Sequence, residues 1–480
     1  MMQPETPRCH TRIQWVDLVR AWCLVLMVAM HDPVLSKAWG GRVHALVRMR
    51  ARCGYDLPRG ALRDRGADVP GSAQVYLFHV PAQVFLSGVC FQRRTTSVGA
   101  ELLRCCRRLL LPYIAHVCVF TAARVVGRHM AGLDERTPRF VARALFFGGR
   151  LLSGNMLSLW ILPVVAFTHM LWVVAMDAVS RGAAAWRDVT AVTDSKGGSQ
   201  AHRGASKRAA DRSVVLVACG FAAVSYCCAV VATTPGRTSG DAAVLPPPVW
   251  FAADAVLSTF PWFAAGQVLR SVLLAAPEGV APLPGGVLAL AASAAVACGV
   301  LSGRWDGLLP HMALDLRQSM LGLPLATPAV TACLIWAHVA CARVAVAWLQ
   351  AMPAEGANGR GARVGDADSE LAGVIEPPTS KHRELQTAIL RRGGRACAAA
   401  ATGVSRHALA AACWHIAVMR SPVFDMVGAP PMVRVVAGIC VPLAVHRAFS
   451  MWWVTRCVML GRQSARVAHV GVQRHAGAAA

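Results

Sequence analysis

Ten runs of apolar residues divide the chain, and each is about 17 to 25 residues long, the length that a helix needs to cross a bilayer. The bilayer core offers no water, so a spanning segment must satisfy its backbone polar groups internally, as an α-helix does. The pattern therefore predicts an all-α fold, a polytopic transmembrane helix bundle of about ten helices. The runs lie at residues 13–31, 74–92, 109–127, 156–177, 213–233, 249–270, 286–302, 322–349, 402–419 and 431–453.

The amino-acid composition favours a membrane protein over a soluble one. Of the 480 residues, 55% are hydrophobic and 15% are charged. The formal net charge of +24 would suit a nucleic-acid-binding protein, but no zinc-finger spacing or other nucleic-acid-binding motif accompanies it. We therefore expect the lipid bilayer, and no nucleic acid, as a partner. The 17 cysteines are scattered without a C-x-x-C pair, so the sequence predicts neither a disulfide framework nor a metal site.

Basic residues indicate the orientation of the runs, because connections rich in Lys and Arg stay in the cytoplasm. Residues 93–108, 178–212 and 350–401 and the C-terminal tail carry such residues on one side of the predicted bundle. An even number of spans then places both termini in the cytoplasm. Residues 32–73 are an exception, since this predicted non-cytoplasmic loop holds seven arginines. The four concordant segments outweigh it.

We expect one domain, residues 1–480, integral to a plasma or internal membrane. Two polar stretches within it, residues 181–212 and 353–401, are rich in Gly, Ala, Ser and charge and lack apolar periodicity. Such composition is typical of mobile loops, here on the cytoplasmic side. No internal repeat is visible, which disfavours an inverted-repeat transporter.

The first run carries ionisable residues that a simple membrane anchor lacks, namely Asp17, Arg20 and His31. The step from Arg20 to His31 is almost three whole helical turns, so both share a face and lie about 16 Å apart along the axis. Ionisable groups at such depth are costly unless they line a polar cavity, which makes a functional site the hypothesis here. An ion pair between Asp17 and Arg20 would lower the cost of burying both. The alternative is a helix that starts near Ala21, with Asp17 and Arg20 at the interface and His31 in solvent.

The second run adds two polar residues, His79 and Ser87. Pro81 removes a backbone donor from this run, and the Ser87-Gly88 pair lets another backbone approach closely, so the helix is suited to bend around a ligand cavity. His79 precedes Pro81 inside an apolar stretch. Such a histidine, taken alone, is more often a satisfied interior residue than a catalytic one.

Three arginines, Arg104, Arg107 and Arg108, stand at the expected cytoplasmic mouth of the third run. Arg104 and Arg107 are three residues apart and Arg108 is one turn from Arg104, so they share a helix face. Such a cluster can hold the phosphates of a cytosolic cofactor by charge-assisted, bidentate hydrogen bonds. The alternative is a positively charged flank that only sets the orientation of the helix.

Six short pieces in this order resemble the acyltransferase-3 family of membrane O-acyltransferases, in particular its branch of fucose 4-O-acetylase-like proteins. Two later segments, FPWFAAGQVLR (Phe260 to Arg270) and GVSRHALAAACWH (Gly403 to His415), resemble the family more loosely. The six pieces are R-x10-H (Arg20, His31), F-H-V-P (Phe78 to Pro81), L-S-G (Leu86 to Gly88), R-x-x-R (Arg104, Arg107), L-L-P-Y (Leu110 to Tyr113) and L-W-I-L-P (Leu159 to Pro163).

The resemblance implies an enzyme that moves an acyl group, usually acetyl, from cytosolic acyl-CoA to a hydroxyl of a glycan or related acceptor at the non-cytoplasmic face. It implies His31 as the catalytic base with Arg20 as its companion. The chemistry agrees, because acyl transfer needs a base for the hydroxyl proton and imidazole titrates near neutrality. The donor-binding cations would be Arg104, Arg107 and Arg108, and the residues that support the site would be Asp17, His79 and Ser87.

Other functions stay open on the residues alone. A proton-coupled secondary transporter, or a flippase of a polar or lipid-linked substrate, would use Arg20 and His31 as its coupled site, and prolines within the runs permit the broken helices of such proteins. A non-catalytic membrane scaffold is a further alternative. Transmembrane N-acetyltransferases of the heparan-glucosaminide type also have a D-x-x-R segment in a first helix, but the F-H-V-P and L-S-G pieces resemble them less.

Overall fold

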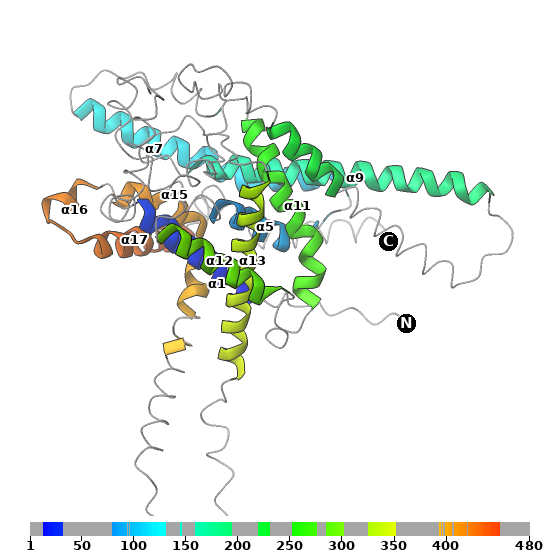
Figure 1. The fold of residues 1–480 in the computed structure, drawn as a ribbon. Helices are drawn as coiled ribbons and strands as arrows, with labels where there is room; N and C mark the ends of the chain where they lie inside the picture. The colour runs from blue at the N-terminus through cyan, green and yellow to red at the C-terminus, as the bar shows by residue number, and fades with distance from the viewer. Residues whose placement is uncertain are drawn as a thin grey trace, which may run out of the picture.

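The computed structural model describes residues 13–31, 79–93, 95, 97–130, 145, 159–193, 219–230, 252–275, 285–301, 325–351, 393–394, 396, 399–405, 408–419 and 421–451. Every regular element among these residues is helical and none is a strand (Figure 1), which confirms the all-α prediction for this part of the chain. The labelled helices are α1 (Gln14–His31), α5 (His79–Cys90), α6 (Val98–Cys105), the π-helical η1 (Cys106–Leu110), α7 (Leu111–Met130), α9 (Ile161–Thr193), α11 (Ala253–Ala275), α12 (Gly286–Leu301), α13 (Ala326–Ala351), α15 (Ala408–Met419), α16 (Pro422–Met426) and α17 (Pro431–Met451). A further apolar helix covers Cys219–Val230.

Each of the ten predicted apolar runs contains a helical segment. Four helices among the described residues are long and apolar enough to cross a membrane. The prediction of a helical membrane protein is therefore confirmed at this level, but the number of ten spans is not. The four candidate spans are Val98–Ala123, Ile161–Gly182, Ala326–Trp348 and Pro431–Ala448.

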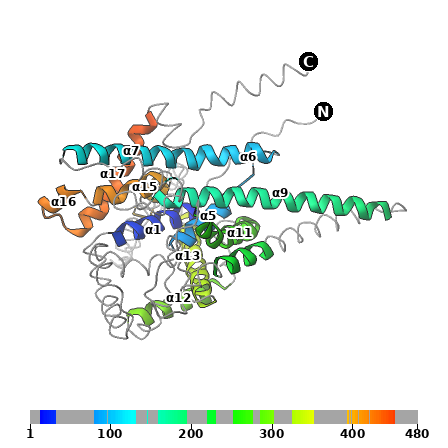
Figure 2. The same ribbon diagram turned by 90° about the horizontal axis from the view of Figure 1, so that it is seen from above.

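Helix α1 packs on two sides and joins two parts of the bundle. On one side, Trp15, Val19 and Cys23 are buried against α5 and α13. On the other side, Leu24 and Val28 are buried against α15 and α17. Figure 2 shows α1 beside α5, α13 and α15. Any polar side chain on α1 is therefore positioned by close packing on both sides.

Helices α5 and α11 cross closely because each has a glycine at the crossing. A Cβ on Gly88 of α5 would overlap the carbonyl oxygen of Phe263, and a Cβ on Gly266 of α11 would overlap that of Phe85. Small residues permit such backbone approach between apolar helices, where van der Waals packing drives association. The crossing holds the C-terminal half of α5 against α11.

Helices α6, η1 and α7 form one continuous rod that begins at a capped turn. Ser97 accepts a hydrogen bond from the backbone N–H of Ala100 at 3.4 Å, as an N-cap residue does. The rod widens to its π-helical turn directly before Pro112, which cannot donate to the carbonyl of Arg108. Both α6 and η1 contact α9, which lies alongside the rod in Figure 2.

Helix α9 is longer than the sequence predicts. The fourth apolar run ends at residue 177, yet α9 continues to Thr193 and projects beyond the other helices in Figure 1. The prediction of a polar loop from residue 181 is therefore wrong as far as residue 193. Alanine and arginine, which are frequent in this stretch, have high helix propensity, which favours the continuation of the helix. The second predicted loop, residues 353–401, is likewise too long at its C-terminal end, because the described residues between 393 and 401 are helical.

Several predictions fall on residues outside the described part of the chain. They concern the arginine-rich loop at 32–73, the remainder of the two polar stretches at 194–212 and 353–392, and both termini. The orientation assigned from the basic residues of these segments stays a prediction.

Candidate functional site

Helix α1 makes two polar contacts, one near each of its ends, with the α15 segment, by which we mean α15 and the described residues 399–405 before it. Near its start, Ser405 donates a hydrogen bond to Oδ1 of Asp17 at 2.6 Å. At its end, the imidazole rings of His31 and His415 have their centroids 5.1 Å apart. Asp17, Ser405 and His415 are buried, and His31 is half-buried. Asp17 contacts Ser405, and the later residue His31 contacts the later residue His415, so the two segments run parallel. Predicted spans one and nine should do so in a bundle whose helices alternate in direction.

The start of α1 decides between the two interpretations of its charges. The helix begins at Gln14, and Asp17 is only 5% exposed. The alternative with a helix start near Ala21 and an interfacial Asp17 is therefore wrong. The suggested ion pair is not formed, since the described residues show no bond between Asp17 and Arg20, and Asp17 bonds Ser405 instead.

A third polar contact joins α5 to α9 in the interior. The Oγ atom of Ser87 lies 2.7 Å from Nε2 of His169. The His169 ring packs against Phe91 and Phe263, with ring centroids 4.9 Å and 4.7 Å away. A hydroxyl can donate or accept, so the contact positions the imidazole in either tautomer. The predicted site residue Ser87 is thus bound to a histidine that the sequence patterns do not single out.

Three arginines from different elements approach the same histidine. The guanidinium groups of Arg20 in α1, Arg104 in α6 and Arg108 in η1 all interact electrostatically with the His169 imidazole. Four of the residues chosen from the sequence therefore interact with His169, Ser87 by direct contact and the three arginines electrostatically. His79, another chosen residue, is buried in the first turn of α5.

The arginines at the mouth of the third run differ in their surroundings. Arg104 forms an ion pair with the fully buried carboxylate of Glu101, and its guanidinium lies 5.8 Å from the centre of the Phe91 ring. Arg107 and Arg108 are exposed at the π-helical turn. The charge of Arg104 is therefore balanced by a neighbouring carboxylate, whereas the side chains of Arg107 and Arg108 are more exposed.

A pocket of about 420 Å³ lies between the end of α5, α9 and α11. One part of its described lining is polar and cationic and the other part is apolar, and no carboxylate is among these described residues. The polar residues are Gln92, Arg93, Gln267 and Arg270. The apolar residues are Phe91, Trp172, Val173 and Met176.

Hydrogen bonds to the last carbonyls of α5 hold the polar side of the pocket. Arg270 donates from Nη1 to the Phe91 carbonyl at 2.6 Å, and Gln267 donates to the same oxygen at 2.9 Å and to the Gly88 carbonyl. The carbonyls at a helix C-terminus lack partners within the helix, so α11 supplies them here.

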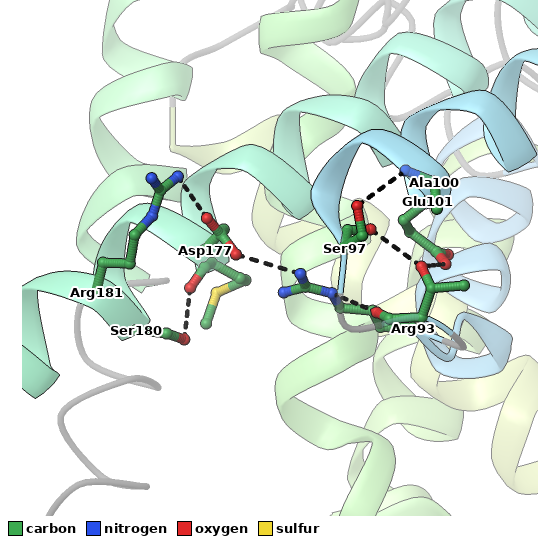
Figure 3. Close-up of polar contacts among 9 residues, drawn as sticks. Arg93, Ser97, Ala100, Glu101, Asp177, Ser180 and Arg181 are labelled. Carbon is green, nitrogen blue, oxygen red and sulfur yellow. Dashed lines mark hydrogen bonds and ion pairs between the residues drawn. The ribbon is translucent and has the colours of Figure 1, made fainter. Parts of the chain in front are cut away.

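An ion-pair network ties the connection after α5 to α9, as Figure 3 shows. Arg93 donates from Nη2 to Oδ1 of Asp177 at 3.2 Å and from Nε to the Thr95 carbonyl at 2.9 Å. The other oxygen of Asp177 is 2.5 Å from Arg181, whose side chain is 78% exposed. One carboxylate therefore serves two cations beside the pocket.

Three interior histidines share a backbone contact that is typical of structural residues. The Nδ1 atoms of His116, His338 and His415 lie 2.7 Å, 2.6 Å and 3.1 Å from the carbonyl oxygen four residues earlier. A carbonyl only accepts, so the proton sits on Nδ1, and in the neutral ring Nε2 carries the lone pair. His415 differs from the other two because its ring lies beside His31.

These features define an α-helical protein whose apolar helices can cross a membrane and whose interior holds paired polar groups. Within the described residues, no cluster of three or more His, Cys, Asp or Glu side chains could hold a metal ion. No protein-family model, curated protein or solved structure matches the chain. The resemblance to acyltransferase-3 proteins therefore rests on the short motifs alone.

Sequence patterns missed two residues of this site, His169 and Arg270. His169 is an isolated polar residue within an apolar run, the same signal that brought His79 to attention. Arg270 ends a segment that resembles the family, but an arginine at the end of an apolar run is equally typical of a cytoplasmic flank. The packing of α5, α9 and α11 is what places His169 and Arg270 at the site, and the sequence patterns do not contain it.

Proposed function

We propose that the chain is a membrane-bound O-acyltransferase that moves an acyl group, with acetyl as the first candidate, from cytosolic acyl-CoA to a hydroxyl of a glycan or related acceptor at the non-cytoplasmic face. The acceptor oxygen forms an ester with the acyl carbon as the thioester bond breaks. His31 takes the hydroxyl proton and passes it to the departing thiolate, which leaves as coenzyme A.

The contact between His31 and His415 carries this proposal. A general base needs a fixed position and a ring that can exchange protons. His415 is fully buried and is held by its bond to the Ala411 carbonyl, so it forms a rigid wall beside the half-buried His31 ring. The contact joins two segments, Arg20 to His31 and Gly403 to His415, that both contribute to the family resemblance.

Cations on the opposite side of the site support a donor that enters from the cytoplasm. Arg107 and Arg108 are exposed and suited to phosphate groups. Arg20 shares a face of α1 with His31, about 16 Å away along the axis. A donor with phosphates near the arginines must therefore extend along α1 to deliver its acyl group to His31, which an elongated thioester such as acyl-CoA can do.

The test is transfer of label from acetyl-CoA by membranes that contain the chain or its His31→Gln variant. General acid–base catalysis contributes about 10²–10⁴-fold, so His31→Gln should lose transfer by at least about a hundredfold. His129→Gln is the matched control, because His129 is exposed near the end of α7. Transfer at the wild-type level in His31→Gln membranes would refute the role of His31 as the base.

The same chain in proteoliposomes distinguishes the enzyme from the transporter or flippase alternative. An O-acyltransferase should release coenzyme A in proportion to the acylated product. Movement of a polar or lipid-linked substrate driven by a proton gradient, with no release of coenzyme A, would favour the alternative.

A further inference from the structure

We infer that the pocket between α5, α9 and α11 binds a phosphate ester that carries a flexible or apolar stem, and that Arg270 and Arg93 hold its phosphate. Where the inference rests on the proposed function, the ligand is the nucleotide part of acyl-CoA. A phospholipid headgroup offers the same chemistry. The assignment adds Arg270 and Arg93 to the cations Arg104, Arg107 and Arg108, on which the sequence alone placed the donor phosphates.

The charge balance of the pocket favours an anion. Among the described residues, two guanidinium groups line it and no carboxylate does. Arg93 pairs with the carboxylate of Asp177, which also pairs with Arg181. Arg104 nearby is already paired with Glu101 and adds no unbalanced charge of its own. A phosphate would supply the negative charge that the described lining residues lack.

The position of Arg270 suits bidentate binding of a phosphate. Its Nη1 bond to the Phe91 carbonyl, 2.6 Å long, fixes the plane of the guanidinium. A guanidinium has five N–H donors, so the remaining donors of the fork are available to a ligand. Gln92 is exposed at the same rim, and Arg104 donates to its backbone carbonyl at 2.9 Å, which fixes the chain there.

The apolar wall of the pocket suits the stem of such a ligand. Trp172 lies on this wall, with its ring centroid 5.8 Å from that of Phe263, and Phe263 also packs on His169. Phe91 lines the pocket and contacts His169 as well. A stem along this wall therefore points from the cationic rim toward the contact between Ser87 and His169. The volume of about 420 Å³ lies in the usual range of small-molecule sites.

The test measures coenzyme A binding to the purified full chain in phosphatidylcholine nanodiscs by titration calorimetry. Arg270→Gln should weaken binding about tenfold, the effect of losing one charge-assisted contact. Gln92→Glu should weaken it and Gln92→Lys should strengthen it, each about threefold to tenfold, because they place opposite charges at one exposed rim position. Arg447→Gln removes an exposed arginine of α17, which is not among the described lining residues of the pocket, and should leave binding within about twofold. If Arg270→Gln fails to fold, the two Gln92 variants decide alone.

Each remaining outcome has one meaning. Suppose that the pocket variants leave coenzyme A binding unchanged, but Arg270→Gln lowers the amount of phosphatidylglycerol retained on the chain, as counted by native mass spectrometry. The phosphate in the pocket then belongs to a lipid. If neither probe responds, the inference is overturned. Wild-type acetyl transfer with an unchanged KM for acetyl-CoA in Gln92→Glu would remove the donor from this pocket and leave the enzyme proposal intact. If coenzyme A binding depends on the pocket residues but the chain transfers no acetyl group, the pocket assignment stands and the enzyme proposal is refuted.

Discussion

Ser405 donates a hydrogen bond of 2.6 Å to Asp17, which lies 388 positions earlier in the chain. Both side chains are buried. A carboxylate among apolar helices is costly unless its oxygens accept hydrogen bonds, so the contact permits an aspartate near the start of α1. It also sets the register of α1 against the α15 segment, and hence the position of His31 beside His415.

Ser405→Ala should lower the free energy of unfolding by about 1–3 kcal/mol, because it leaves a buried carboxylate oxygen without this donor. The measurement is thermal unfolding of the purified chain in detergent. Ser180→Ala is the matched control, since Ser180 is exposed and bonds only the Met176 carbonyl of its own helix, at 2.7 Å. An equal, small effect of both substitutions would contradict a stabilising role for the contact with Asp17.

Gly88→Ala and Gly266→Ala should each destabilise the chain by about 1–3 kcal/mol or more, because a methyl group would overlap the backbone of the facing helix. Neither overlap can be relieved by turning a side chain. Gly182→Ala is the control, since nothing lies within 4 Å of a Cβ added there and alanine favours helix. The yield of monodisperse protein and its unfolding temperature report the effect. Stable Gly88→Ala protein would mean that α5 and α11 do not cross as closely as described.

The helices could be predicted from the sequence because apolar run length reports directly on membrane-spanning segments. The same signal fails at the end of α9, because hydropathy reports lipid contact and not helix propensity, and the alanines and arginines among residues 181–193 are good helix formers. It also cannot count the spans, since an apolar run and a helix of spanning length are different properties.

The polar contacts could be predicted only in part. Helical spacing relates side chains within one helix, so it placed Arg20 and His31 on one face of α1. It also offered Arg20 as the partner of Asp17, whereas the partner comes from a distant segment. Contacts between helices, such as Ser87 with His169, depend on how the runs pack, and periodicity within a run carries no information about that.

The contact between Ser87 and His169 should appear as an energetic coupling between α5 and α9. Ser87→Ala and His169→Phe should each destabilise the chain, and the double variant should lose less than the sum by about 0.5–3 kcal/mol. Phenylalanine keeps an aromatic ring against Phe91 and Phe263 and removes the nitrogen atoms. As a control cycle, Ser293→Ala on α12 should be additive with His169→Phe, because Ser293 bonds its own helix at Ala289. Strict additivity in the first cycle would contradict the hydrogen bond.

Arg104 and Arg107 should separate into a structural and a ligand-binding residue. The carboxylate of Glu101 is 0% exposed and Arg104 is 14% exposed, so Arg104→Gln leaves a buried charge without its ion pair and should cost about 3 kcal/mol of stability. Arg107 is exposed, and Arg107→Gln should leave the unfolding temperature unchanged.

Under the proposed function, Arg107→Gln should instead raise the KM for acetyl-CoA more than the KM for the acceptor, because its charge lies on the donor side of the site. The measurement is steady-state transfer with each substrate varied in turn. Equal changes in both KM values would assign Arg107 to membrane orientation. For Arg104→Gln, a wild-type unfolding temperature would show that its ion pair with Glu101 does not stabilise the chain.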